Sequence, residues 1–222
     1  MPASYFDVDG TLVRTNLVHP TLFYLLHQRT PFRSFLKVAE TALRAPRLAV
    51  AEWQDRRIFN EALFSAYQGM SHDRLHLLSD EAFEKVMKPA LFPKSRDLIK
   101  RCKDEGHEVV LVSGALDFVM RHLQEYLGAD TVICNKLEFK HGFATGRLLR
   151  PVVAGPEKAA LIRDHAEEKG HALKDSFAYS DSYSDVPMLS VVGHPAAVNP
   201  DSRLKRLART YGWPVLTLET ST

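Results

Sequence analysis

The sequence contains few cysteines, no long apolar run and almost no net charge, and each of these absences excludes a class of protein. Its two cysteines, Cys102 and Cys134, are too few for a disulfide framework, and no Cys-x-x-Cys pair indicates a zinc ribbon. No apolar segment approaches the length of a membrane-spanning helix. The 29 basic residues exceed the 27 acidic residues by only two, which does not predict a nucleic-acid partner.

The composition itself is typical of a soluble globular protein. Of the 222 residues, 45% are hydrophobic and 25% are charged. An acidic residue already occurs at position 7, which does not fit the pattern of a secretory signal peptide. We therefore expect a cytoplasmic protein that forms one ordinary domain, or one domain that carries a smaller insertion.

Short apolar segments, each closed by glycine or polar residues, predict the strands of a buried sheet. Four segments are clear, at residues 5–10, 109–112, 131–134 and 176–180, and weaker candidates lie at 196–198 and 214–216. Helical patterns at residues 95–105, 117–127 and 156–169 alternate with these strands. The alternation predicts an α/β fold with a doubly wound, mostly parallel, Rossmann-like sheet as its core.

One segment near the N-terminus interrupts this alternation. Between residues 15 and 88 helical patterns dominate, at 20–27, 31–43, 52–67 and 73–86, and no convincing strand is present. We interpret the segment as an inserted all-helical cap of four helices. The predicted organisation is a core at residues 1–14, the cap at 15–88 and the rest of the core at 89–222.

Polar side chains stand where the predicted strands end, and these are the candidate site residues. Asp7 and Asp9 close the first strand, and Ser113 closes the second. Asp181 and Asp185 follow the fourth strand, and Lys158 lies in the first turn of a helix. Each residue alone has a simpler explanation as a turn, cap or solvated residue. Together they point to one site, because ligands bind at the carboxyl ends of the strands in open parallel sheets.

These groups suit phosphoryl chemistry. Four neighbouring carboxylates repel one another unless a cation lies among them, and Mg²⁺ prefers oxygen ligands shared with a substrate phosphate. A lysine and a serine hydroxyl suit the remaining phosphate oxygens. An ionised aspartate can attack phosphorus without an activating base, and a second carboxyl group can protonate the leaving alcohol and later deprotonate a water molecule.

The order of these residues resembles the four motifs of the haloacid dehalogenase superfamily. Residues 7–13, Asp-Val-Asp-Gly-Thr-Leu-Val, are similar to its first motif, Asp-x-Asp-Gly-Thr. Val112-Ser113-Gly114 resembles the second motif, Lys158 the third, and Asp181-Ser-Tyr-Ser-Asp185 the fourth. The resemblance extends from residue 4 to about residue 200. The helical insertion after the first motif, and a hairpin-like segment that begins at Asn135, resemble the phosphoserine-phosphatase-like subgroup, subfamily IB.

The resemblance implies a role for each motif residue. Asp7 is then the nucleophile and Asp9 the general acid and base. The implied ligands of Mg²⁺ are Asp7, the backbone carbonyl of Asp9 and Asp181, with Asp185 orienting the metal or its waters. Ser113 and the Gly114 amide are implied to bind the phosphoryl group, and Lys158 to neutralise charge on it and on Asp7.

Two departures from the family pattern bear on the substrate. Asn16 stands nine residues after Asp7, where phosphoserine phosphatases usually carry a glutamate that pairs with the substrate ammonium. An uncharged side chain there argues against phosphoserine as the substrate. The fourth motif usually begins with Gly-Asp and often has Asn as its penultimate residue, whereas here these positions are Ser180-Asp181 and Ser184.

The cap is expected to determine specificity, since the core residues recognise only the phosphoryl group. Arg56 and Arg57 are candidate substrate residues together with Asn16, because the subgroup uses a cap arginine in this region. A further group of basic residues has one acidic neighbour, Glu40: Arg29, Arg33, Lys37, Arg44 and Arg47. They can steer an anionic substrate or contact an anionic membrane, but we favour an ordinary solvated helix face.

We therefore predict an enzyme, a magnesium-dependent phosphomonoester hydrolase that acts on a small phosphorylated metabolite through an aspartyl-phosphate. One alternative is a phosphotransferase or mutase, which passes the same phosphoryl group to a second substrate. Another is a lipid-phosphate phosphatase that uses the basic cap. A signalling receiver is disfavoured by the length and the insertion, and an inactive phosphate-binding adaptor by the complete set of core residues. The sequence does not name the substrate, the pathway or the oligomeric state.

Overall fold

The core of the molecule is a six-stranded parallel sheet. A computed structural model describes residues 1–27 and 56–219. The strands lie in the order β3-β2-β1-β6-β7-β8, and every neighbouring pair is parallel. Their bounds are β1 Ala3–Phe6, β2 Glu108–Leu116, β3 Thr131–Asn135, β6 Phe177–Ser180, β7 His194–Val198 and β8 Val215–Leu216. This confirms the predicted α/β class and the doubly wound, Rossmann-like sheet.

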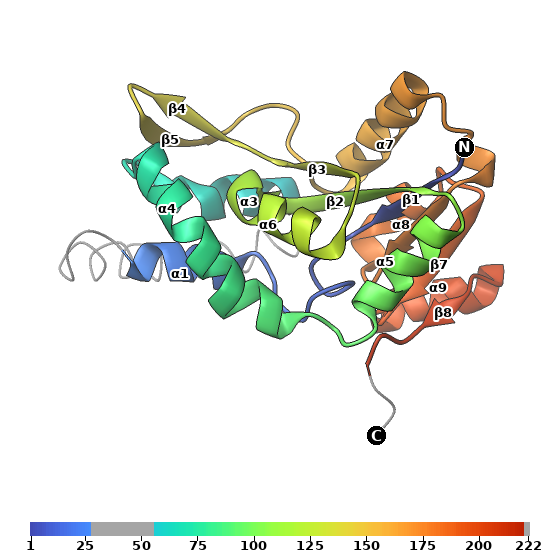
Figure 1. Ribbon diagram of the computed structural model, residues 1–222. Coiled ribbons are helices and arrows are strands. Elements are labelled where there is room, and N and C mark those ends of the chain that lie inside the picture. The colour runs from blue at the N-terminus through green and yellow to red at the C-terminus, as the bar shows by residue number, and fades with distance from the viewer. Residues whose placement is uncertain (28–55, 220–222) are drawn as a thin grey trace.

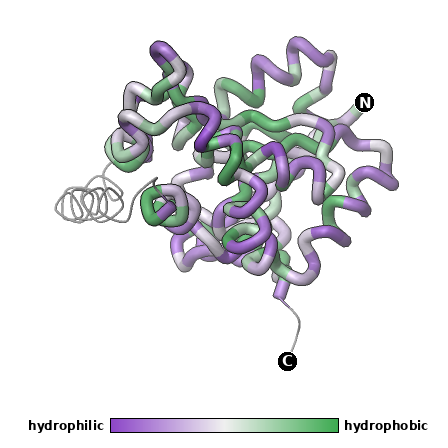
Figure 2. Tube along the Cα trace, turned by 60° about the vertical axis from the view of Figure 1, so that its left-hand side comes forward, coloured by the Kyte–Doolittle hydropathy of each residue, from purple (hydrophilic) through white to green (hydrophobic). Residues whose placement is uncertain are grey.

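Helices cover both faces of this sheet, which explains why its strands are apolar throughout. Helices α5 (Ser95–Asp104) and α6 (Asp117–Leu127) pack on the face that includes Phe6 and Leu111. The opposite face, which includes Tyr5 and Val112, is covered by α7 (Pro156–Lys169), α8 (Val186–Leu189) and α9 (Ser202–Tyr211). Figure 2 shows the result: the strands inside are mostly green, whereas the surrounding helices carry purple stretches.

The predicted helices α6 and α7 have the bounds expected from the sequence, but two strands differ. The first strand ends at Phe6 instead of continuing to Gly10, because the carbonyl of Val8 accepts bonds from the amides of the next turn. The second strand continues past Ser113 and Gly114, with a register shift there, instead of ending at them.

Two helices lie outside those predicted from the sequence, the short α8 and the longer α9. The boundary signals of α9 are nevertheless present. The Asp201 side chain accepts hydrogen bonds from the amides of Arg203 and Leu204, and Gly212 ends the helix with a φ of 69°.

The segment between β1 and α5 begins with turns at residues 7–17 and is mostly helical in the rest of its described part. It contains α1 (Val18–Leu26), α3 (Arg56–Phe64) and α4 (His72–Ala82), followed by a π-helical turn, Phe83–Met87. These helices lie beside the sheet, next to the antiparallel hairpin of β4 (Leu137–Lys140) and β5 (Phe143–Leu148) (Figure 1). The predicted helix at 31–43, the start of the one at 52–67 and the five basic residues between 29 and 47 lie outside the described residues. The cap boundaries of 15 and 88 therefore stay a prediction.

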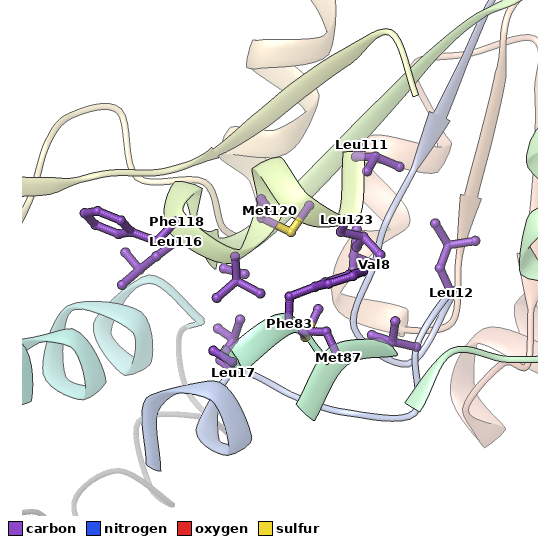
Figure 3. Close-up of a cluster of buried hydrophobic side chains, with 14 of the residues drawn as sticks. Val8, Leu12, Leu17, Phe83, Met87, Leu111, Leu116, Phe118, Met120 and Leu123 are labelled. Atoms are coloured by element: carbon purple, nitrogen blue, oxygen red, sulfur yellow. The ribbon is translucent and has the colours of Figure 1, made fainter. Parts of the chain in front are cut away.

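Apolar side chains join the inserted helices to the core. Leu17 at the start of α1 and Phe83 and Met87 of the π-helical turn lie in one buried cluster with Leu116 of β2 and Leu123 of α6 (Figure 3). All five are less than 10% exposed. The inserted helices thus share a hydrophobic core with the sheet, which fixes them next to its carboxyl edge.

Candidate active site

The site begins at the end of the central strand. β1 has a neighbour on each side, and its last hydrogen bond is donated by the Asp7 amide to the Tyr179 carbonyl at 2.9 Å. The chain then turns sharply, with Gly10 at a φ of 84°. The turn places the Asp7 and Asp9 side chains at the carboxyl edge of the sheet, where both line a small cavity.

Lys158 of α7 binds two carboxylates at once. Its Nζ donates to Asp7 Oδ1 at 2.6 Å and to Asp185 Oδ2 at 2.8 Å, and all three side chains are at most 7% exposed. Burial alone would lower the pKa of Lys158, but Asp185 and Asp7 raise it above its ordinary value. Asp185 is also held by the Ser180 hydroxyl, which donates to Oδ2 at 2.8 Å. The serine that departs from the family's usual glycine therefore has a function in positioning this carboxylate.

Thr11 links Asp7 to Asp181. Its hydroxyl lies 2.9 Å from Asp7 Oδ2 and 3.1 Å from Asp181 Oδ1, and it accepts the Asp181 amide at 3.0 Å. Burial, and next the charge of Asp7, raise the pKa of Asp181 to about 8. Burial likewise raises the pKa of Asp7, against the lowering effect of Lys158. Burial and the closeness of these carboxyl groups to one another therefore disfavour their ionised forms.

Asp9 lies in a different environment from Asp7. Its Oδ2 accepts a long hydrogen bond of 3.4 Å from the Ser113 hydroxyl. Burial, and then the neighbouring Asp7, raise the pKa of Asp9 to about 7, while Lys158 and Arg56 oppose this rise. A carboxyl group whose pKa lies near neutrality can both donate and accept a proton, which is what acid–base chemistry needs.

The buried side-chain amide of Asn135 holds the end of β2 in place. Asn135 donates to the Gly114 carbonyl at 2.7 Å, and its Oδ1 accepts the Val153 amide at 2.8 Å. Ser113 is fully buried, and its Oγ accepts the Ala115 amide at 3.0 Å. Gly114 lines the cavity, whereas Ser113 does not. The backbone of Gly114 is therefore held rigidly at the site.

The cavity has a volume of about 50 Å³ and collects most of the predicted site residues. From the core it is lined by Asp7, Asp9, Gly114, Lys158, Asp181 and Asp185, and from the inserted segment by Asn16, Leu17, Arg56, Phe59 and Asn60. Arg57 is not part of this lining, and its Nε lies 3.5 Å from Glu61 Oε1. Of the two arginines predicted from the sequence, the structure thus brings only Arg56 to the cavity.

Asn16 has a structural contact as well as a place in the cavity. Its Oδ1 accepts the Val18 amide at 3.1 Å, at the start of α1, and lies 3.0 Å from His19 Nδ1. The polar residues at or next to the cavity that were not among the sequence-predicted site residues include Thr11, Asn60, Asn135, Ser180, Ser182 and Ser184. Thr11 and the serines lie within or beside the predicted motifs, and Asn135 begins the hairpin-like segment noted in the sequence, whereas nothing in the sequence marks Asn60.

The donor set fits a magnesium ion held by few protein ligands. In the described part of the chain, no three His, Cys, Asp or Glu side chains are placed to enclose a metal ion by themselves. Mg²⁺ does not need such a cage, because it keeps several waters and is commonly bound by one or two carboxylates plus substrate phosphate. Asp7 and Asp181, which meet across Thr11, provide two such carboxylates. Asp185 is instead engaged by Lys158 and Ser180, which suits an orienting role.

Comparison with known proteins identifies the family. The model of the haloacid dehalogenase-like hydrolases matches residues 5–190. The chain belongs to this family. The phosphoserine phosphatase SerB1 of Mycobacterium tuberculosis is 31% identical over 214 residues, which cover 96% of this chain and 70% of SerB1. A Bordetella pertussis protein of unknown function has a similar structure, with a TM-score of 0.83, 25% identity and 98% of each chain covered.

The phosphoserine-phosphatase-like assignment is also confirmed. A substrate-bound phosphoserine phosphatase superposes with a TM-score of 0.71 and 19% identity, covering 97% of this chain and 92% of the other, and so shares the fold. The relatives support the predicted enzyme class, a phosphatase of this hydrolase family. Among the residues that the structure describes, no helix is both long and apolar enough to cross a membrane.

Proposed function

We propose that the protein is a magnesium-dependent phosphomonoester hydrolase that forms an aspartyl-phosphate on Asp7. The observation that carries the proposal is the position of Lys158, whose Nζ lies 2.6 Å from Asp7 Oδ1 in a site closed from water on the core side. The Lys158 ammonium group favours the ionised form of Asp7, and it lies next to the oxygen atoms on which negative charge develops during phosphoryl transfer. Asp9, two residues further along, supports the acid–base step.

The reaction follows from these groups in two steps. An Asp7 carboxylate oxygen attacks phosphorus, the bond from phosphorus to the ester oxygen breaks, and Asp9 gives its proton to the departing alcohol. Asp9 then accepts a proton from a water molecule, which attacks the acyl phosphate and releases inorganic phosphate and Asp7. The Gly114 amide and Lys158 bind the phosphoryl oxygens. A bound Mg²⁺ would neutralise charge on the phosphoryl group and keep Asp7 and Asp181 ionised.

The substrate is proposed to be a small phosphorylated metabolite in the cytoplasm. Asn16 and Arg56 approach the cavity from the inserted segment, so both are placed to contact the leaving alcohol. The names of relatives such as SerB1 suggest phosphoserine. The uncharged Asn16 favours a different alcohol, because an amide does not compensate the charge of an ammonium group as a carboxylate does.

The proposal is tested by phosphate release from p-nitrophenyl phosphate in buffer that contains Mg²⁺ and no added acceptor. Asp7→Asn should abolish release and prevent acid-stable labelling by a ³²P ester. The control is Asp164→Asn, an exposed aspartate on α7, which should retain full activity. Turnover by the Asp7 variant would exclude the mechanism. Labelling without release, relieved by adding an alcohol acceptor, would instead identify a phosphotransferase.

A further inference from the structure

Asn60 on α3 is buried in the wall of the active-site cavity, and one of its polar atoms has no partner. Its side chain lies among the cavity-lining residues, one helical turn after Arg56, and is 2% exposed. Nδ2 donates to the Val153 carbonyl at 3.4 Å. Oδ1 is fully buried and accepts no hydrogen bond from any group in the described part of the chain.

The orientation of this amide is determined by its neighbours. The Val153 carbonyl only accepts hydrogen bonds, so the NH₂ group of Asn60 faces it and the carbonyl oxygen points elsewhere. The nitrogen also lies close above Gly114, since a Cβ on that glycine would be 2.9 Å from Asn60 Nδ2. Asn60 therefore sits directly beside the backbone that we assign to phosphoryl binding.

A second asparagine beside Val153 has both of its side-chain polar atoms paired, so the unpaired oxygen of Asn60 is not a general feature of this region. Asn135 contacts the same Val153 carbonyl at 3.4 Å, but its Oδ1 is paired with the Val153 amide. A buried carbonyl oxygen without a donor is unfavourable, and native proteins rarely keep one outside functional sites. In a cavity that receives a substrate, the missing donor is most simply supplied by the substrate.

We propose that Asn60 Oδ1 accepts a hydrogen bond from an O–H or N–H group on the carbon chain of the substrate's leaving alcohol. The inference rests on the proposed phosphatase function and specifies its substrate class. The enzyme then selects phosphomonoesters whose alcohol carries a hydroxyl or amino group over simple alkyl phosphates. Phe59 and Leu17, which line the same wall, offer this group no hydrogen bond. Asn16 Oδ1, at the same cavity, already accepts the Val18 amide, whereas Asn60 Oδ1 has no donor among the described residues and is free to accept a hydrogen bond from this group.

Two matched pairs of esters test the inference and separate the two kinds of donor. Glycerol 3-phosphate against propyl phosphate reports on a hydroxyl donor, and phosphoethanolamine against ethyl phosphate reports on an ammonium donor. The wild type should prefer the donor-bearing ester of at least one pair by about tenfold or more in kcat/KM. Asn60→Leu, which keeps the branching of the side chain and removes both polar atoms of the amide, should reduce that preference about tenfold.

Asn60→Asp provides a second variant in case the leucine disturbs packing, because it retains an acceptor oxygen. It should keep the preference that the leucine variant loses. Asn135→Leu is the matched structural control: it removes the other amide that contacts Val153 and should lower kcat/KM equally for both members of a pair. A preference unchanged in Asn60→Leu, or an equal loss on both members, would overturn the inference.

Failure of this inference differs from failure of the proposed function. If no ester is hydrolysed, p-nitrophenyl phosphate included, the phosphatase assignment itself is wrong. If the wild type hydrolyses all esters but shows no preference within either pair, the phosphatase assignment stands and Asn60 does not select the substrate.

Discussion

Replacing Gly10 by alanine should disable the site through a single methyl group. A Cβ on Gly10 would lie 2.2 Å from Asp181 Oδ2 and 2.6 Å from Asp181 Cγ, whereas ordinary contacts are 3.4–4 Å. The Asp181 carboxylate must therefore move by roughly 1 Å, a displacement that can reduce catalysis about 100-fold. The φ of 84° adds backbone strain of about 1 kcal/mol, which lowers the melting temperature of a domain of this size by about 2–4 °C.

Activity assays on two variants distinguish the effect of displacing the Asp181 carboxylate from the effect of straining the backbone. We expect kcat/KM for p-nitrophenyl phosphate to fall about 100-fold in Gly10→Ala, and the Mg²⁺ concentration for half-maximal activity to rise at least about tenfold. Gly106→Ala is the control, because Gly106 has a φ of 79° but no atom within 4 Å of its would-be Cβ. It should lose similar thermal stability and keep full activity. Wild-type activity and Mg²⁺ dependence in Gly10→Ala would refute the placement of Asp181 at the metal.

Three further predictions concern the charges, the metal and the cap. Lys158→Met leaves Asp7 and Asp185 buried without a counter-charge. The free energy of unfolding, measured by thermal unfolding in EDTA at pH 7, should therefore be about 3 kcal/mol lower than in the wild type. Because Lys158 lowers the pKa of Asp7, its removal raises that pKa, the folded variant binds more protons, and the deficit should shrink as the pH falls. EDTA should abolish phosphate release by the wild type and excess Mg²⁺ should restore it; activity that persists in EDTA would contradict the metal assignment. Asn16→Ala should lower the free energy of unfolding by about 1 kcal/mol through the lost hydrogen bond from the Val18 amide, and a rise in KM at unchanged kcat would show contact with substrate.

The residues that the sequence predicts best are those whose position depends on local rules. Asp7 and Asp181 follow short apolar strands, and parallel strands bring their carboxyl ends to one edge, so their proximity follows from chain order. The bounds of α6 and α7 are equally local, since a glycine in the left-handed conformation ends each helix, at Gly128 and Gly170.

What the sequence does not predict depends on contacts between distant segments. Asn60 and Asn135 are 75 positions apart, and both reach the carbonyl of Val153, a contact that no local pattern encodes. The choice between Arg56 and Arg57 depends on which face of α3 points to the cavity. The raised pKa values of Asp9 and Asp181 likewise arise from burial and from neighbouring carboxylates, which come together only in the folded chain.

The central position of β1 has a consequence for synthesis on the ribosome. Tyr5 pairs with Val110 on one side and with Ala178 on the other, so the first strand made cannot complete its pairing until the chain is four-fifths finished. At ordinary elongation rates, the interval between the end of β2 and the end of β6 lasts on the order of 3–13 s. Throughout it, one edge of β1 is open to pairing with other nascent chains, and Asp7 has neither Asp181 nor Asp185 beside it. The proposed site therefore stays incomplete until this last group of residues has emerged.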